Sequence, residues 1–234
     1  MNLPNSLTIG RIAATPAITA LIMNPPWQYR LSAWVLFLAA AVTDYYDGKL
    51  ARSRNLVTKT GKLLDPIADK LLLIATVVPI YWLTRGVKLF AKVPEDAQWV
   101  AGTVGPVSLG EHVAYPFVTP LGLMPATLWI VAVIIGRELF MTLLRQHAAR
   151  RGVVISAIGP AKLKTIFQNI WVGAAFFWFF AASAARQYEW TNGAWGAFAH
   201  FNGIVGTLAM LIALTLTLSS LGIYLRRYGR LLLK

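Results

Sequence analysis

Six long apolar segments constrain the fold of this chain more than any other feature of its sequence. Each segment has about 20 residues, the length at which an α-helix crosses the hydrocarbon core of a bilayer. We expect these helices at residues 6–23, 31–54, 62–83, 126–149, 164–185 and 203–224. Since 57% of the 234 residues are hydrophobic and only 13% are charged, the sequence predicts an all-α integral membrane protein with a single domain over residues 1–234.

The Lys and Arg residues predict how the six helices are oriented. They cluster in the links after the second and fourth apolar segments and in the C-terminal tail, whereas the opposite links mix cations with acids. Under the positive-inside rule the basic side faces the cytoplasm, so both termini are predicted to be cytoplasmic, in the inner membrane of the cell. The net charge of +13 is thus explained by membrane topology, and no nucleic-acid partner is predicted.

Residues 84–125 interrupt the helical pattern. This stretch is rich in Gly and Pro, carries three of the nine acidic residues, and has no uninterrupted apolar run long enough to span a bilayer. It is predicted to be an extracytoplasmic insertion, with a surface-lying helix as one possibility.

Four carboxylates lie at the ends of two neighbouring apolar segments. Asp44 and Asp47 are three residues apart and Asp65 and Asp69 are four apart, so on helices each pair projects from one face. The short link between the segments makes them antiparallel neighbours, which places both pairs on the same side of the membrane, at its cytoplasmic interface. Four acids against hydrocarbon need a compensating partner, and hard oxygen donors suit Mg²⁺ or Mn²⁺.

Small residues accompany the acids. Gly48 and Ala51 remove side-chain bulk beside Asp47, which would let a bulky ligand such as a nucleotide approach the backbone. Arg52 follows with a guanidinium group suited to a diphosphate. Close helix packing, common in membrane bundles, is the alternative explanation for the two small residues.

The complete pattern resembles the signature of the CDP-alcohol phosphotransferase family. It reads Asp44-x2-Asp47-Gly48-x2-Ala51-Arg52-x8-Gly61-x3-Asp65-x3-Asp69. The resemblance implies attack of an alcohol on the β-phosphate of a CDP-linked substrate with release of CMP, at a site with two divalent ions, in a homodimer. It also implies that all four aspartates bind metal, that Asp69 is the catalytic base, and that the CDP-lipid is bordered by Gly48, Ala51, Arg52 and Gly61.

Secondary motifs resemble the phosphatidylglycerophosphate synthase branch of this family. They lie at residues 2–11, 64–70, 136–145, 152–155 and 161–165, with Ala161 where that branch usually has glycine. This likeness implies CDP-diacylglycerol as donor and glycerol 3-phosphate as acceptor. The residues predicted to bind the acceptor phosphate are Thr8, Arg11, Arg137, Arg145, Lys162 and Lys164.

Several alternatives stay open. Another acceptor would make the protein a cardiolipin synthase or an inositol-phosphate transferase of the same family. A different class, an ion or lipid transporter, would use membrane acids as a cation pathway. Arg137 has its own alternative role, an intramembrane ion pair with the neighbouring Glu138.

Overall fold

The computed structural model describes residues 3–53, 59–92, 106–155, 159–190 and 192–229. Inside these ranges, the side chains of residues 3–4, 45, 47–53, 59–60, 62–63 and 160–162 are not described. The described residues form six α-helices: α1 (Leu3–Met23), α2 (Trp27–Ser53), α3 (Lys59–Thr84), α4 (Leu128–Arg150), α5 (Gly159–Gln187) and α6 (Gly193–Tyr228). Each predicted helical range coincides with one of them.

The largest difference in a helix boundary is at α6, which begins ten residues before the predicted start at residue 203. Asn192 explains the earlier start, because its side chain accepts a hydrogen bond from the backbone N–H of Trp195 and so caps the helix. The ring of Trp195 also stacks on that of Trp178 in α5, with ring centroids 5.6 Å apart. The first turns of α6 are thus packed against the bundle.

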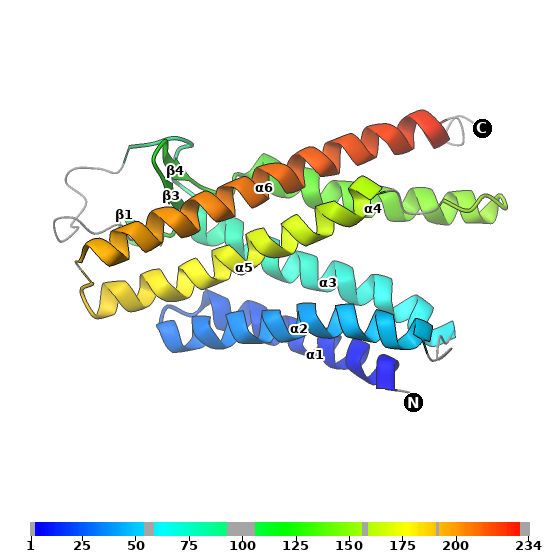
Figure 1. Cartoon of the computed structure of the whole chain (residues 1–234), viewed down its shortest axis with the longest axis horizontal. Helices are drawn as coiled ribbons and strands as arrows, with labels where there is room; N and C mark the ends of the chain where they lie inside the picture. The colour runs from blue at the N-terminus through cyan, green and yellow to red at the C-terminus, as the bar shows by residue number, and fades with distance from the viewer. Residues whose placement is uncertain (1–2, 54–58, 93–105, 156–158, 191, 230–234) are drawn as a thin grey trace.

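The helices lie alongside one another in an elongated bundle (Figure 1). Helix α1 packs against α2 and α3, and α5 packs against α2 and α6. Figure 1 shows that α1 begins and α6 ends at the same end of the bundle, where α2 also ends and α3 begins. The short β-strands lie toward the other end.

Four of the described helices contain segments long and apolar enough to cross a membrane. These segments are Asn5–Met23, Leu64–Thr84, Leu163–Gln187 and Gly193–Tyr228. The chain therefore has the architecture of a multi-pass membrane protein. Helices α2 and α4 are less apolar because each carries several charged residues along its length.

The insertion between α3 and α4 contains two β-hairpins, so a helix lying on the surface is not what its described residues form. Strand β1 (Val107–Leu109) pairs with β2 (His112–Ala114), and β3 (Phe117–Thr119) pairs with β4 (Gly122–Met124), both antiparallel. Gly110 and Gly122 supply the positive φ angles of the two hairpins, at 64° and 114°. Prolines at positions 116 and 120 disfavour a continuous helix here.

Strand β3 packs deeply against α6, a contact that the sequence did not predict. Phe117 and Val118 are only 5% and 2% exposed. A Cβ atom at Gly203 would lie 1.8 Å from the Val118 carbonyl oxygen, and one at Gly206 would lie 2.3 Å from the Phe117 ring. Both positions therefore require glycine for this close approach.

We expect Gly203→Ala to destabilise the fold by about 1–3 kcal/mol, because strand or helix must shift to make room for the added methyl group. The measurement is thermal unfolding of the purified protein in detergent. Gly222→Ala is the matched control, since it lies on the same helix and a Cβ atom there would meet nothing within 4 Å. Equal melting temperatures for the two variants would contradict the packing of β3 on α6.

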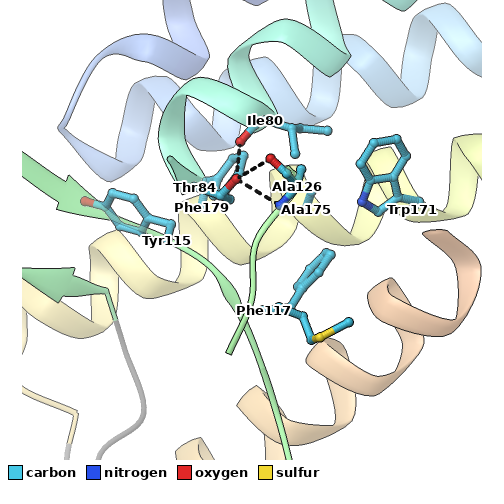
Figure 2. Close-up of a pocket in the computed structure, with 9 residues that line it drawn as sticks. Ile80, Thr84, Tyr115, Phe117, Ala126, Trp171, Ala175 and Phe179 are labelled. Carbon is cyan, nitrogen blue, oxygen red and sulfur yellow. Dashed lines mark hydrogen bonds between the residues drawn. The ribbon is translucent and has the colours of Figure 1, made fainter. Parts of the chain in front are cut away.

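Thr84, the last residue of α3, connects this helix to the chain just before α4, at the end of the bundle where the hairpins lie. Its hydroxyl donates to the Ile80 carbonyl at 2.9 Å and accepts from the Ala126 N–H at 3.0 Å (Figure 2). Only about 10 Å³ of space remains beside these groups, where Tyr115, Phe117 and Phe179 converge. This end is therefore closely packed.

Candidate active site

A cavity of about 290 Å³ opens among α2, α3, α4 and α5. Its wall on the side of α2 and α3 carries Asp44, Asp65 and Asp69, and its wall on α4 and α5 carries Arg145 and Lys164. Other polar residues that line it are Lys70, Thr76, Glu138, Thr142, Thr165, Gln168 and Asn169. Carboxylates and cations that are far apart in the sequence thus share one cavity.

The acids come from the last turns of α2 and the first turns of α3. Asp65 and Asp69 are four residues apart on α3 and line the same cavity, as their helical spacing predicts. Asp44 reaches the cavity from α2, while the side chain of Asp47 lies outside the described residues. Because α2 ends where α3 begins, these acids lie near the end of the bundle opposite the hairpins (Figure 1).

Helix α1 supplies two partners to the carboxylates. The Thr8 hydroxyl donates a 2.9 Å hydrogen bond to Asp65, and an Arg11 guanidinium nitrogen donates to both Asp44 and Asp69, the latter at 3.1 Å. Arg11 is only 3% exposed, so its charge is buried beside these acids. Neither residue is among those that line the cavity.

The donor chemistry fits a hard divalent cation, since carboxylate oxygens are the ligands that Mg²⁺ and Mn²⁺ prefer. In the part of the chain that the structure describes, no three His, Cys, Asp or Glu side chains are gathered closely enough to form a metal-binding group. That search does not include the side chain of Asp47. The residues are thus chemically suitable, but a complete ligand set is not seen.

Glu138 forms ion pairs with one cation on α4 and one on α5. Its carboxylate accepts from Lys164 and, at 2.6 Å, from Arg137, which also donates to Ser220 of α6 at 3.0 Å. Arg137 therefore forms the ion pair that the sequence left open as an alternative. It is 5% exposed and is not among the residues that line the cavity, whereas Arg145 and Lys164 are.

The remaining predicted site residues are placed less fully. Gly61 is buried in the first turn of α3. Four other positions lie on described helical backbone, but their side chains, or the surroundings of the glycine, fall outside the described residues: Gly48, Ala51, Arg52 and Lys162.

Sequence reasoning assigned no binding role to several polar residues of the cavity. Glu138 follows Arg137 directly in an apolar segment. Because an acid inside such a segment requires a charged or polar partner, its position in the sequence could have indicated a role in the site. Gln168 and Asn169 follow Lys164 by one helical turn, so they share its side of α5. These polar side chains would let the cavity hydrogen-bond a polar ligand.

Comparison with known proteins gives a family match over nearly the whole chain. A family model described as CDP-alcohol phosphatidyltransferase matches residues 1–219. The match includes all four aspartates and extends through α1 to the last turns of α6.

Individual relatives are similar to different extents of the chain. A CDP-diacylglycerol–glycerol-3-phosphate 3-phosphatidyltransferase from Rickettsia bellii is 57% identical over 72 residues, which is 30% of this chain and 39% of that protein. One of the same name from Bacillus subtilis is 33% identical over 186 residues, covering 74% and 75%. A cardiolipin synthase (CMP-forming) from Oryza sativa is 34% identical over 165 residues, covering 70% and 41%. The chain thus matches well under two thirds of the Rickettsia and Oryza proteins.

Proposed function

The chain belongs to the CDP-alcohol phosphatidyltransferase family, and on that premise we propose that it transfers the phosphatidyl group of CDP-diacylglycerol to glycerol 3-phosphate. The products are phosphatidylglycerophosphate and CMP. The observation that carries the proposal is the shared cavity, which Asp44, Asp65 and Asp69 line together with Arg145 and Lys164. The names of the Rickettsia and Bacillus relatives, which state this donor and acceptor, support it.

In this proposal Asp44, Asp47, Asp65 and Asp69 hold two divalent cations, either Mg²⁺ or Mn²⁺. Bound cations would neutralise the diphosphate of the donor and the negative charge that develops on the departing CMP. The CDP group lies along the end of α2, beside Gly48, Ala51 and Arg52, with Gly61 on α3. The small residues leave room for the nucleotide, and the arginine binds a phosphate.

Asp69 acts as the catalytic base. Its carboxylate accepts the proton of the attacking glycerol 3-phosphate hydroxyl while a new O–P bond forms at the β-phosphate. The bond between that phosphorus and the bridging oxygen breaks, and CMP leaves with the electron pair. A base must first be within reach of its proton, and Asp69 lines the cavity in which we place the acceptor.

The acceptor phosphate binds to Arg145 and Lys164, with Lys162 at the start of α5 nearby. Glu138 orients Lys164 by accepting its hydrogen bond, and Arg137 supports Glu138 from the buried side. Arg137 is therefore proposed to act on the acceptor through Glu138. Two cationic side chains that bind the same phosphate form strong, oriented hydrogen bonds with it.

The membrane arrangement follows from the same proposal. All six helices cross the inner membrane, with both termini and the active site at the cytoplasmic interface, and the protein is a homodimer. The four strongly apolar helices support the membrane assignment. The dense Lys and Arg residues in the links after α2 and α4 support the orientation.

A panel of acceptors tests the function. Purified protein receives CDP-diacylglycerol, Mg²⁺ or Mn²⁺, and one of glycerol 3-phosphate, phosphatidylglycerol or inositol phosphate, and CMP release is measured. We expect glycerol 3-phosphate to be the productive acceptor, with no release when a chelator removes the divalent ions. Release with phosphatidylglycerol instead would favour the second candidate, a cardiolipin synthase, which the similarity to the Oryza protein supports. Ion or lipid flux in vesicles without any CMP would indicate a transporter.

A further inference from the structure

Two buried side chains of α1 point toward the aspartates. Thr8 and Arg11 are three residues apart, so they project from the same face of the helix. They are 1% and 3% exposed, which makes them the most deeply buried polar residues of α1. A buried charge or hydroxyl needs a partner to offset its loss of solvation.

Those partners are carboxylates on two other helices. Thr8 donates to Asp65 at 2.9 Å, and Arg11 donates to Asp44 on α2 and to Asp69 on α3, the latter at 3.1 Å. Helix α1 therefore contacts each of the three cavity aspartates whose side chains are described. Arg11 thus bridges Asp44 of α2 and Asp69 of α3.

We infer that Thr8 and Arg11 are positioning residues that fix the orientation of the aspartate carboxylates, in place of the acceptor-phosphate role that sequence resemblance implied. This inference rests on the proposed function, in which those carboxylates bind divalent cations. A carboxylate has two oxygens and about four acceptor sites, so a bond to Thr8 or Arg11 leaves capacity for a cation. Residues that hydrogen-bond to metal ligands fix the orientation of those ligands.

The surroundings of Arg11 argue against a direct contact with the acceptor phosphate. Its guanidinium already lies between two carboxylates, and a phosphate at the same place would meet the repulsion of both. Arg145 and Lys164, in contrast to Arg11, line the cavity itself, from α4 and α5. The acceptor phosphate has a better site there.

The principal test is Thr8→Val, which removes the hydroxyl but keeps the side-chain shape and the net charge. Mn²⁺ is titrated into the purified protein, and free Mn²⁺ is followed by electron paramagnetic resonance. We expect the affinity for Mn²⁺ to be weaker than that of the wild type by about 10-fold or more. Such a loss is typical when a residue that hydrogen-bonds to a metal ligand is removed. Thr8→Ser, which keeps the hydroxyl, should restore most of the affinity.

Thr217→Val is the matched control. Thr217 is likewise 1% exposed, but it lies on α6 and its hydroxyl donates to the carbonyl of Ala213 within its own helix. This control should bind Mn²⁺ as the wild type does. Thermal unfolding checks that each variant is folded, and Thr8→Ala replaces Thr8→Val if the valine variant does not fold.

Arg11 is tested by separating kcat from KM. In Arg11→Gln we expect kcat to fall about 10-fold or more while the KM for glycerol 3-phosphate stays close to the wild-type value, because the change disturbs the carboxylates. Arg11→Lys, which keeps the charge, should lose less activity. A large increase in KM with kcat unchanged would return Arg11 to the acceptor site and overturn its positioning role.

The outcomes separate this inference from the proposed function. A wild-type protein that neither binds Mn²⁺ nor releases CMP would contradict the proposed function itself. A wild type that does both, together with a Thr8 variant lacking the hydroxyl that binds Mn²⁺ equally well, would overturn the positioning role alone.

Discussion

An Asp69→Asn variant is expected to release CMP at about one thousandth of the wild-type rate or less. General base catalysis alone contributes about 10²–10⁴-fold, and Asp69 is proposed to bind a cation as well. The amide keeps the size of the side chain, and its oxygen can still accept the Arg11 hydrogen bond that spans 3.1 Å in the wild type. The variant should therefore fold and retain much of its binding to the CDP-lipid.

CMP release with saturating CDP-diacylglycerol and glycerol 3-phosphate measures the effect, and thermal unfolding shows whether the variant is intact. Glu189→Gln is the matched control, because Glu189 is an exposed acid beyond the end of α5 and does not line the cavity. This control should retain wild-type turnover. A folded Asp69→Asn protein with normal CMP release would refute the role of Asp69 as base.

An Arg145→Ala variant is expected to raise the KM for glycerol 3-phosphate by about 10- to 100-fold. Hydrogen bonds to charged groups contribute about 1.5–3 kcal/mol, and this change removes a guanidinium that faces the proposed acceptor site. The KM for CDP-diacylglycerol should change much less, because the donor diphosphate is assigned to the aspartate wall of the cavity.

Steady-state kinetics with each substrate varied in turn provide the measurement. Arg150→Ala is the matched control, since Arg150 is an exposed arginine at the end of the same helix and does not line the cavity. It should leave both KM values unchanged. Equal increases for donor and acceptor in Arg145→Ala would argue against an acceptor site at this wall.

Features that depend on local helical geometry could be predicted from the sequence. The apolar segments correctly indicated six helices, since length and hydrophobicity along one stretch of chain decide whether it forms a membrane helix. The spacing of Asp65 and Asp69 correctly predicted that they share a face, because four residues are about one helical turn. The family assignment rests on this same pattern of spacings and is borne out by the match over residues 1–219.

The strands of the insertion between α3 and α4, and the packing of β3, are what local reasoning did not predict. These strands have only three residues each, too few for a clear alternation of polar and apolar side chains. The burial of β3 depends on Gly203 and Gly206 of α6, more than 80 residues away along the chain. No pattern within residues 84–125 reports that contact.

By itself the sequence determined the helices, the spacing of the aspartates and the family, because each of these is set by residues close together along the chain. Only the tertiary structure decided which groups meet across helices. It paired Thr8 with Asp65 and joined Lys164 to Glu138, which are 57 and 26 residues apart. Such pairs depend on how whole helices pack, since packing sets the distance and rotation between their faces.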